Sequence, residues 1–373
     1  MSTNALPQSV LPAPAARREA DARRATAARE RLREAPDDTD ALFELADAHA
    51  RMGRHDDARS AHRALLRADG RYADLRAPVE KQCATSFIGQ FDSVDCPVCG
   101  DHHANMVWVG NISGQVRTWG HLDPVREWVE CTSCETLRVQ APPSEAALQR
   151  WHRARSHEHS PTSAPNLREF DAAMAERNHE LDVLEQVGFG IAWLDDPDAH
   201  EPRLLEVGCG WGSLIAAARW RGISAAGVGT NAQTAWARAT LDLPCVAADL
   251  DHGIRPEHLP DGSFDIIVLR SPLDRAEAPL AVLQAAARRL SPDGVLVLQL
   301  ELHDHPVRRV QGYDAPGWSR PERRVFFGRD TLEVALARTH LRSERIQEVR
   351  DASSGTSLLF VRHDDLHDLM GAE

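Results

Sequence analysis

Lysine is almost absent from this sequence of 373 residues, and Lys81 is the only one. The other basic residues are arginines, and the excess of acidic side chains gives a formal net charge of −13. An acidic chain repels phosphate groups, which argues against general binding to nucleic acids or anionic lipids. The pairs Arg17-Arg18 and Arg23-Arg24 are therefore interpreted as a solvated helix face rather than a phosphate site.

Long apolar runs are also lacking, because no stretch approaches the ~20 apolar residues of a membrane span. The N-terminus has no apolar signal core, and residues 1–14, rich in Pro and Ala, are predicted to be a disordered tail. Four of the seven cysteines form two Cys-x-x-Cys pairs, and the other three are scattered. Because secreted disulfide frameworks are not built this way, the pattern favours a reducing cytoplasm and a cytoplasmic protein.

The length of the chain suits two or three domains, and residues 15–80 are predicted to be helical. Leu42, Ala46 and His49 share one face at helical spacing, and the pattern resumes at Ala58. This segment resembles one tetratricopeptide repeat with a second half-match upstream, although a plain helical hairpin is an equal alternative. A repeat implies a concave surface, so a protein partner is predicted at the helical N-terminus.

Residues 81–150 contain both cysteine pairs, Cys96/Cys99 and Cys131/Cys134. Two Cys-x-x-Cys turns supply four thiolates, the tetrahedral set that binds structural zinc, and the Val- and Trp-rich segments between them alternate like short strands. The segment is therefore predicted to be a zinc ribbon, although the gap between its pairs is longer than usual. His102 or His103 could replace a thiolate, and a dithiol redox pair is the competing chemistry.

The segment Leu204–Ile215 reads LLEVGCGWGSLI, an apolar strand followed by glycines and a helix start. Glycine accepts positive φ and lets a ligand approach the backbone, whose free N–H groups face that ligand at the helix start. An ordinary turn of another Rossmann-like domain is the alternative. With its acidic residue two positions before the first glycine, the segment resembles the first motif of class I S-adenosylmethionine (SAM)-dependent methyltransferases. The resemblance implies that Glu206 lies near the cationic end of SAM and that Gly208, Cys209, Gly210 and Gly212 line the cofactor.

Strand-like and helical runs alternate through residues 201–373, after a linker and helix over 151–200. Together they predict an α/β fold, the Rossmann-like seven-stranded sheet of a class I methyltransferase. The expected strands are Leu204–Val207, Ser224–Val228, Cys245–Ala248, Phe264–Leu269, Val295–Leu300, Arg342–Arg350 and Thr356–Arg362. The expected helices are Asn166–Val187, Ser213–Trp220, Thr234–Leu241 and Pro279–Leu290, and Ser291–Gly294 is expected to turn into the fifth strand.

Ligands of such sheets bind at the carboxyl ends of the strands, which adds further cofactor residues. The family usually has an acid at the end of the second strand, but this chain has Gly229, Thr230 and Asn231 there. Thr230 and Asn231 are the expected substitutes, and neutral hydrogen bonds predict weaker SAM binding than a carboxylate would give. By the same resemblance, Asp249 and Leu250 contact adenine, while Arg270 faces the methyl group.

Methyl transfer from SAM depends mainly on alignment, because the cofactor carries the reactivity. If a base is used, His303 and His305 are the candidates, since histidine transfers protons near neutral pH. Asp274 and Tyr313 are weaker candidates, and a base is not required for every acceptor. Arg323 stands where many relatives have histidine, which is expected to affect substrate choice.

The chain from about Asp95 to Arg362 resembles bacterial methyltransferases of glycan and natural-product clusters that carry an N-terminal zinc ribbon. Glu135 replaces the glycine that usually follows the second cysteine pair. The resemblance implies methyl transfer to a small molecule, a sugar or glycan precursor, or a natural product. One alternative is an RNA methyltransferase whose ribbon binds RNA. Another is a partner-binding protein with a degenerate SAM site.

Overall fold

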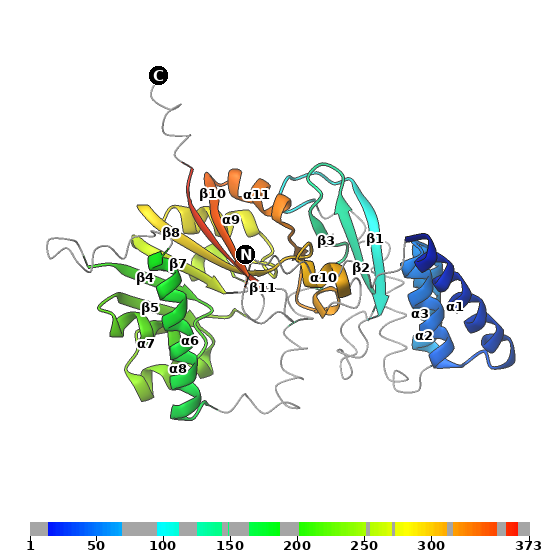
Figure 1. Ribbon diagram of the computed structural model, residues 1–373, viewed down its shortest axis with the longest axis horizontal. Helices are drawn as coiled ribbons and strands as arrows, with labels where there is room; N and C mark the ends of the chain where they lie inside the picture. The colour runs from blue at the N-terminus through cyan, green and yellow to red at the C-terminus, as the bar shows by residue number, and fades with distance from the viewer. Residues whose placement is uncertain are drawn as a thin grey trace, which may run out of the picture.

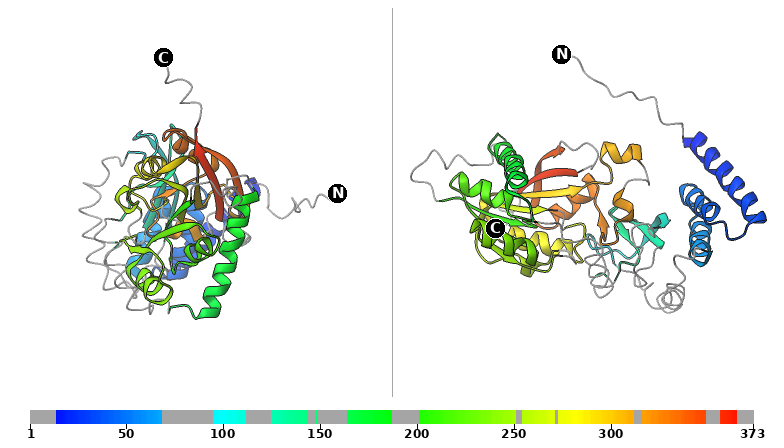
Figure 2. Two further views of the ribbon diagram at one scale, coloured as in Figure 1. Left: turned by 90° about the vertical axis from the view of Figure 1, so that its left-hand side faces the viewer. Right: turned by 90° about the horizontal axis from the view of Figure 1, so that it is seen from below.

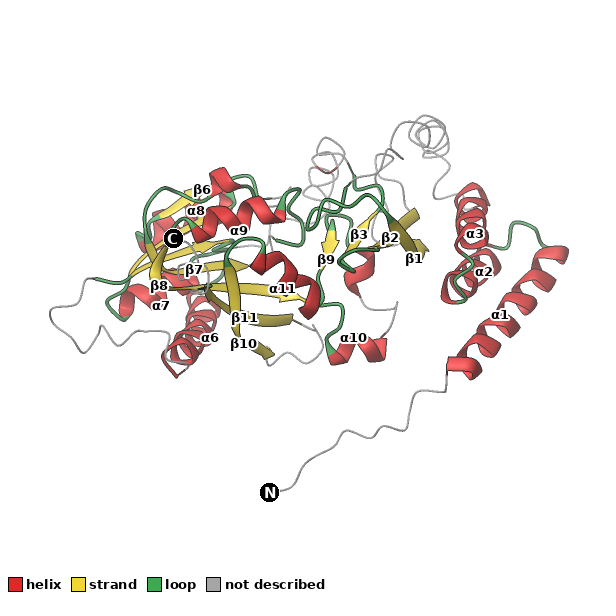
Figure 3. Cartoon of the chain, turned by 90° about the horizontal axis from the view of Figure 1, so that it is seen from above, coloured by secondary structure: helices red, strands yellow, loops and turns green. Residues whose placement is uncertain are grey.

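The computed structural model describes residues 14–68, 95–111, 125–143, 148, 164–186, 201–250, 254–270, 273–311, 316–348 and 356–364. These residues form an N-terminal group of helices, a small antiparallel sheet and a large sheet covered by helices, which follow one another in a row (Figures 1 and 3). Seen from below, the N-terminal helices lie at the end of the row away from the large sheet (Figure 2). In these ranges every helix is too short or too polar to cross a lipid bilayer.

The N-terminal helices are α1 (Pro14–Glu34), α2 (Thr39–Arg51) and α3 (His55–Ala68). Asp38 begins α2 as its N-cap, because its side chain accepts a hydrogen bond of 2.9 Å from the Ala41 amide. The apolar face predicted for α2 and α3 is largely buried, and Ala50 and Ala58 pack in one cluster with Trp108 of the small sheet. Helices thus fill the predicted segment as far as Ala68, while residues 69–80 lie outside the described residues. Membership of the tetratricopeptide family stays a prediction.

The small sheet contains β1 (Ala104–Asn111), β2 (Val125–Cys131), β3 (Leu137–Val139) and β9 (Val325–Phe326), in that order and all antiparallel. The alternating Val and Trp residues form strands as expected, because their side chains pack with Trp318 and Phe326. The fourth strand was not predicted. It comes from far along the chain, so the cysteine-containing segment and the C-terminal part share one sheet.

The large sheet has seven strands in the order β10-β11-β8-β7-β4-β5-β6, which confirms the predicted α/β fold. The strands are β4 (Arg203–Val207), β5 (Ser224–Gly229), β6 (Cys245–Ala247), β7 (Phe264–Arg270), β8 (Leu290–Glu301), β10 (Leu341–Glu348) and β11 (Thr356–His363). The five from β8 to β6 are parallel, and β11 is antiparallel to both β8 and β10. The carboxyl ends of the five parallel strands therefore share one edge.

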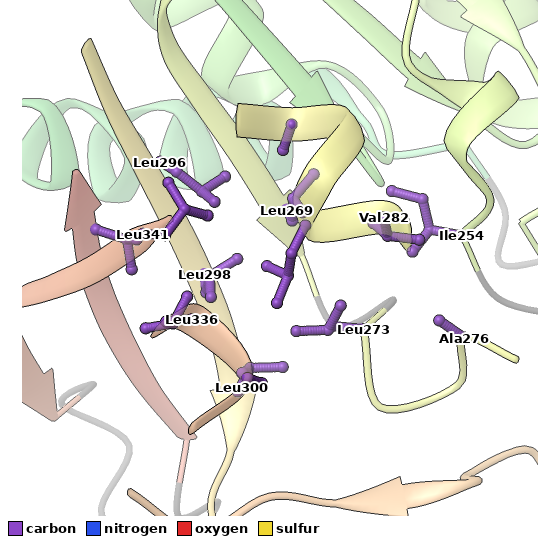
Figure 4. Close-up of a cluster of buried hydrophobic side chains, with 14 of the residues drawn as sticks. Ile254, Leu269, Leu273, Ala276, Val282, Leu296, Leu298, Leu300, Leu336 and Leu341 are labelled. Carbon is purple, nitrogen blue, oxygen red and sulfur yellow. The ribbon is translucent and has the colours of Figure 1, made fainter. Parts of the chain in front are cut away.

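Helices cover both faces of this sheet, which is why its central strands are nearly continuous apolar runs. On one face lie α6 (Leu167–Gln186), α7 (Ser213–Trp220) and α8 (Asn231–Leu241). On the other lie α9 (Pro279–Ala287) and α11 (Arg329–Ala337), and Leu336 packs with Leu296 and Leu298 of β8 (Figure 4). The short helices are η3 (Pro256–His258), α10 (Pro306–Gln311) and η5 (Pro316–Ser319).

The structure corrects the boundary between α9 and β8. The helix expected over Pro279–Leu290 ends at Ala287, and the expected turn Ser291–Gly294 belongs to β8. The strand begins early because Leu290 pairs with Phe264 of β7, whose amide donates to the Arg289 carbonyl at 2.7 Å. The register shifts between the pairs Phe264–Leu290 and Ile266–Val295. Ser291–Gly294 therefore form an irregular part of β8 rather than the separate turn that the Pro-Asp-Gly sequence predicted.

His62 gives the packing between α3 and the small sheet a pH dependence. The side chain is buried, and this burial lowers the pKa of His62 to about 4, with Asp47 partly opposing the shift. The unfolded chain binds the proton near pH 6.5 and the folded chain only near pH 4. Stability is therefore full above pH 6.5 and decreases as the pH falls towards 4, by up to about 3 kcal/mol.

We expect His62→Leu to remove this loss, because leucine has no proton to gain. The measurement is urea unfolding of both proteins at pH 7 and pH 5. His179→Leu, at an exposed position of α6, is the matched control and should keep the wild-type pH dependence. An equal loss of stability in wild type and His62→Leu would show that other groups cause it.

Candidate functional site

The glycine loop lies between β4 and α7, at the carboxyl edge of the large sheet. Gly208, Gly210 and Gly212 have φ of +89°, +53° and +87°, a left-handed conformation that L side chains adopt only with strain. The amides of Gly208 and Cys209 donate to the Val228 carbonyl at 2.8 and 3.0 Å, which fixes the loop on β5. A Cβ on Gly210 would meet no atom of the described residues within 4 Å, so this part of the backbone is open to a ligand.

Glu206 lies directly before the loop and is only 1% exposed. Its Oε1 accepts a hydrogen bond from Nε of Arg270, whereas Oε2 is buried and has no hydrogen-bond partner among the residues that the structure describes. Burial raises the pKa of Glu206, and the positive charge of Arg270 opposes this shift. A buried carboxylate oxygen without a donor is costly, so the site suits a ligand that brings an N–H or ammonium group.

Arg270, at the end of β7, joins three elements at this edge. Besides Glu206, its guanidinium donates to Gln299 Oε1 of β8 at 2.7 Å and to Glu180 Oε2 of α6 at 2.6 Å. Gly208 lies against the same residue, because a Cβ there would be 3.0 Å from the Arg270 carbonyl oxygen. The structure thus brings together the predicted residues Glu206, Gly208 and Arg270, and it adds Glu180 and Gln299, for which no sequence signal was found.

The other predicted cofactor residues follow the neighbouring parallel strands. Thr230 begins α8 and donates to Gln233 Oε1 at 2.9 Å, while Asn231 is exposed beside it. Asp249, which is exposed, and Leu250 follow β6, whose Ala247 pairs with Gly229 of β5. All four therefore lie at the same edge as the glycine loop, at the ends of adjacent strands.

The structure gives a reason for the missing acid after the second strand. A Cβ on Gly229 would lie 2.9 Å from Sγ of Cys209 and 3.1 Å from Cγ2 of Thr234. The Cys209 side chain thus occupies the space into which a side chain at Gly229 would project. Replacing Cys209 by a smaller residue would be needed before an acid could fit here.

His303 and His305 follow β8 at the side of the sheet that faces the small sheet. The His303 amide donates to the Phe327 carbonyl at 2.9 Å, and its ring packs edge-on against Phe326 at 5.9 Å. His305 is buried, and its Nδ1 accepts from the Val307 amide at 3.2 Å, at the start of α10. Both rings thus help to hold the local fold, and their role as a base stays a prediction. Tyr313 lies outside the described residues.

Arg323 is a buried cation that holds neighbouring segments together, and its expected effect on substrate choice stays a prediction. Its side chain is 1% exposed and donates to Asp274 and Glu301 at 2.8 Å each, and its guanidinium lies 4.4 Å from the centre of the Phe326 ring. Two buried carboxylates require such a cation, because an unpaired buried charge is strongly destabilising. Arg323 therefore ties the chain before β9 to the ends of β7 and β8.

The four predicted metal ligands converge on one point. Cys96 Sγ lies 3.5 Å from Cys134 Sγ, Cys99 Sγ lies 3.4 Å from Cys131 Sγ, and all four sulfur atoms lie within 4.8 Å of one another. Each turn closes with a hydrogen bond to the carbonyl of its first cysteine, and Glu135 takes a left-handed φ of +57° in place of the usual glycine. Asp101, His102 and His103 form a separate, more exposed group.

Residues 184–344 match the model of a family described as a methyltransferase domain. No curated protein sequence matches the chain. Among solved structures, mitomycin 7-O-methyltransferase is similar, with 15% identity over 82% of this chain and 72% of that chain and a TM-score of 0.39. Another similar structure is the Burkholderia thailandensis 1,6-didemethyltoxoflavin-N1-methyltransferase with bound 1,6-didemethyltoxoflavin and S-adenosylhomocysteine. It is 18% identical over 63% of this chain and 98% of that chain, with a TM-score of 0.41. The family match assigns residues 184–344 to a methyltransferase domain.

Proposed function

Because residues 184–344 form a methyltransferase domain, we propose that the chain transfers the methyl group of SAM to a small-molecule, sugar, glycan or natural-product acceptor. The observation that carries the proposal is the combination of an open Gly210 backbone with the buried, unpartnered Oε2 of Glu206. SAM, when bound, supplies an electrophilic methyl group on its sulfonium sulfur. The protein has to bind and orient the two substrates and exclude water.

Residues at the ends of neighbouring strands would each bind a different part of SAM or the acceptor. Glu206 would accept a hydrogen bond from the ammonium group of SAM, and the glycine loop would lie against the middle of the cofactor. Thr230 and Asn231 would bind the ribose and Asp249 the adenine, since they follow successive strands along the edge. The acceptor would bind beyond β7 and β8, where His303 and His305 are the candidate bases.

A small acceptor is favoured over RNA by charge and by the way the small sheet is covered. The net charge of −13 opposes a polyanion. The sheet packs against α2 and α3 through Ala50 and Ala58, and its fourth strand belongs to the C-terminal part of the chain. Among the similar structures, the mitomycin and toxoflavin methyltransferases are named for small-molecule substrates. A protein partner of α1–α3 stays a prediction.

We also propose that the four cysteines hold one structural zinc ion. Cys96 and Cys131 are buried, and four converging sulfur ligands match the closed tetrahedral set of structural sites. A closed set leaves no open coordination position, so this metal would stabilise the fold and take no part in methyl transfer.

The proposed function is tested by calorimetric titration of the zinc-loaded protein with SAM, followed by assays of methyl transfer to small-molecule, glycan and RNA acceptors. We expect micromolar binding of SAM, and labelled methyl groups in a small acceptor rather than RNA. Saturable methylation of RNA at physiological salt would favour the RNA alternative. If SAM does not bind even at millimolar concentration, the chain is not an autonomous methyltransferase.

A further inference from the structure

Arg270 and Glu206 form an ion pair at the glycine loop, in which only the arginine has nearly all its hydrogen bonds satisfied. The guanidinium is nearly saturated by Glu206, Gln299 and Glu180, whereas no described residue donates to Oε2 of Glu206. An acid with a free oxygen beside a base complements a ligand that carries an ammonium and a carboxylate group together. Such a ligand can reach the guanidinium only if one of its present partners leaves.

Glu180 is the partner that can leave at the lowest cost. Glu206 is buried and Gln299 lies within β8, but the Glu180 side chain is 23% exposed. Its Oε1 accepts a long hydrogen bond of 3.5 Å from Arg270 and also accepts from Arg177, one turn earlier on α6. If Glu180 releases Arg270, Arg177 remains as its counter-ion, so no carboxylate is left unpaired. To release Arg270, the Glu180 side chain only has to rotate, because its contact with Arg177 already exists.

The helix itself can stay in place during this exchange, because other residues anchor it. At one end Phe170 packs against Trp236 of α8, at 5.6 Å between ring centres, and Trp236 packs against Trp211 of the glycine loop. Further along, Asp182 and Asn178 accept hydrogen bonds from Arg221, after α7. Glu180 thus contacts Arg270 from α6, and the charge of Arg177 on the same helix also acts on Glu206.

We propose that Glu180 is a displaceable counter-ion of Arg270, and that the carboxylate of the amino-acid group of SAM takes its place while the ammonium group binds Glu206. This inference rests on the proposed function and adds a regulatory contact to it. When SAM is absent, Glu180 pairs with Arg270. A ligand without the amino-acid group does not displace Glu180.

The test compares the affinities of SAM and 5′-methylthioadenosine, which lacks the amino-acid group, without an acceptor. In Glu180→Gln we expect SAM to bind about 3- to 10-fold more tightly, because its competitor has lost its charge, and methylthioadenosine to bind as in wild type. Arg177→Gln should act in the opposite direction, because Glu180 then has no other cation and stays on Arg270. Asp182→Asn, on the same helix but facing Arg221, should change neither affinity.

The possible failures are distinguishable. If wild type binds SAM and Glu180→Gln weakens both ligands equally, Glu180 is a structural clamp and the exchange is excluded. If Glu180→Gln does not fold, Arg177→Gln decides, because an unchanged SAM affinity in that variant also excludes the exchange. If wild type binds neither ligand, the proposed function fails and the exchange fails with it.

Discussion

Gly210→Val is expected to abolish the binding of SAM, with a loss of affinity of about 100-fold or more, equivalent to ~2.7 kcal/mol. A Cβ at this position meets no protein atom within 4 Å, so the new side chain fits the folded chain and projects into the space left for a ligand. The measurement is calorimetric titration with SAM, together with thermal unfolding to show that the variant is folded.

Gly222→Val is the matched control for this variant. Gly222 has a φ of +81°, and a Cβ there likewise meets no atom within 4 Å, so both substitutions pay a similar backbone strain of about 1–2 kcal/mol. Gly222 follows α7 and precedes β5, at the opposite edge of the sheet. Gly222→Val should bind SAM as wild type does. If both variants lose binding equally, strain is the cause and Gly210 does not line the cofactor.

The large sheet could be predicted from the sequence because its signals are local. Apolar runs such as Phe264–Leu269 form buried parallel strands, and the glycine loop combines three residues with positive φ in five positions. Ser213–Trp220 is helical as predicted, because the glycine loop ends directly before Ser213 and Gly222 follows the C-cap Arg221. Each of these features depends on residues close together in sequence.

The features that could not be predicted depend on residues far apart. Strand β9 has only two residues, and it is a strand because β3 pairs with it. The sequence did not show that Arg323 pairs with Asp274 and Glu301, which lie 49 and 22 residues away. Glu180 gave no signal on its helix, since its partner Arg270 is 90 residues away. Position in three dimensions, rather than residue type, gives these side chains their roles.

Removal of the proposed zinc is expected to destabilise the whole chain rather than the small sheet alone. Cys96 and Cys131 belong to the same apolar cluster as Leu259, Leu273 and Ala276, which border the ends of the central strands. Loss of the proposed zinc would leave the two Cys-x-x-Cys turns without the metal that joins them, with thiols buried in its place. The free energy of metal binding contributes to folding, so this loss destabilises the fold. We expect Cys96→Ser to lower the free energy of unfolding by about 3 kcal/mol or more and the melting temperature by ~4 °C or more.

The packing of the cysteines with Leu273 and Ala276 also predicts how methyl-transfer activity responds to loss of the metal. Leu273 and Ala276 follow β7 next to Asp274, which Arg323 ties to the chain before β9. Since this segment lies on the acceptor side, metal loss should lower kcat more than it weakens SAM binding. Measured zinc should be about one per chain in wild type and in the control His103→Ala, because four sulfur atoms complete the site without the histidine. Wild-type stability and activity in chelator-treated protein with no bound zinc would refute this prediction, and a dithiol pair would then be the better interpretation of the four cysteines.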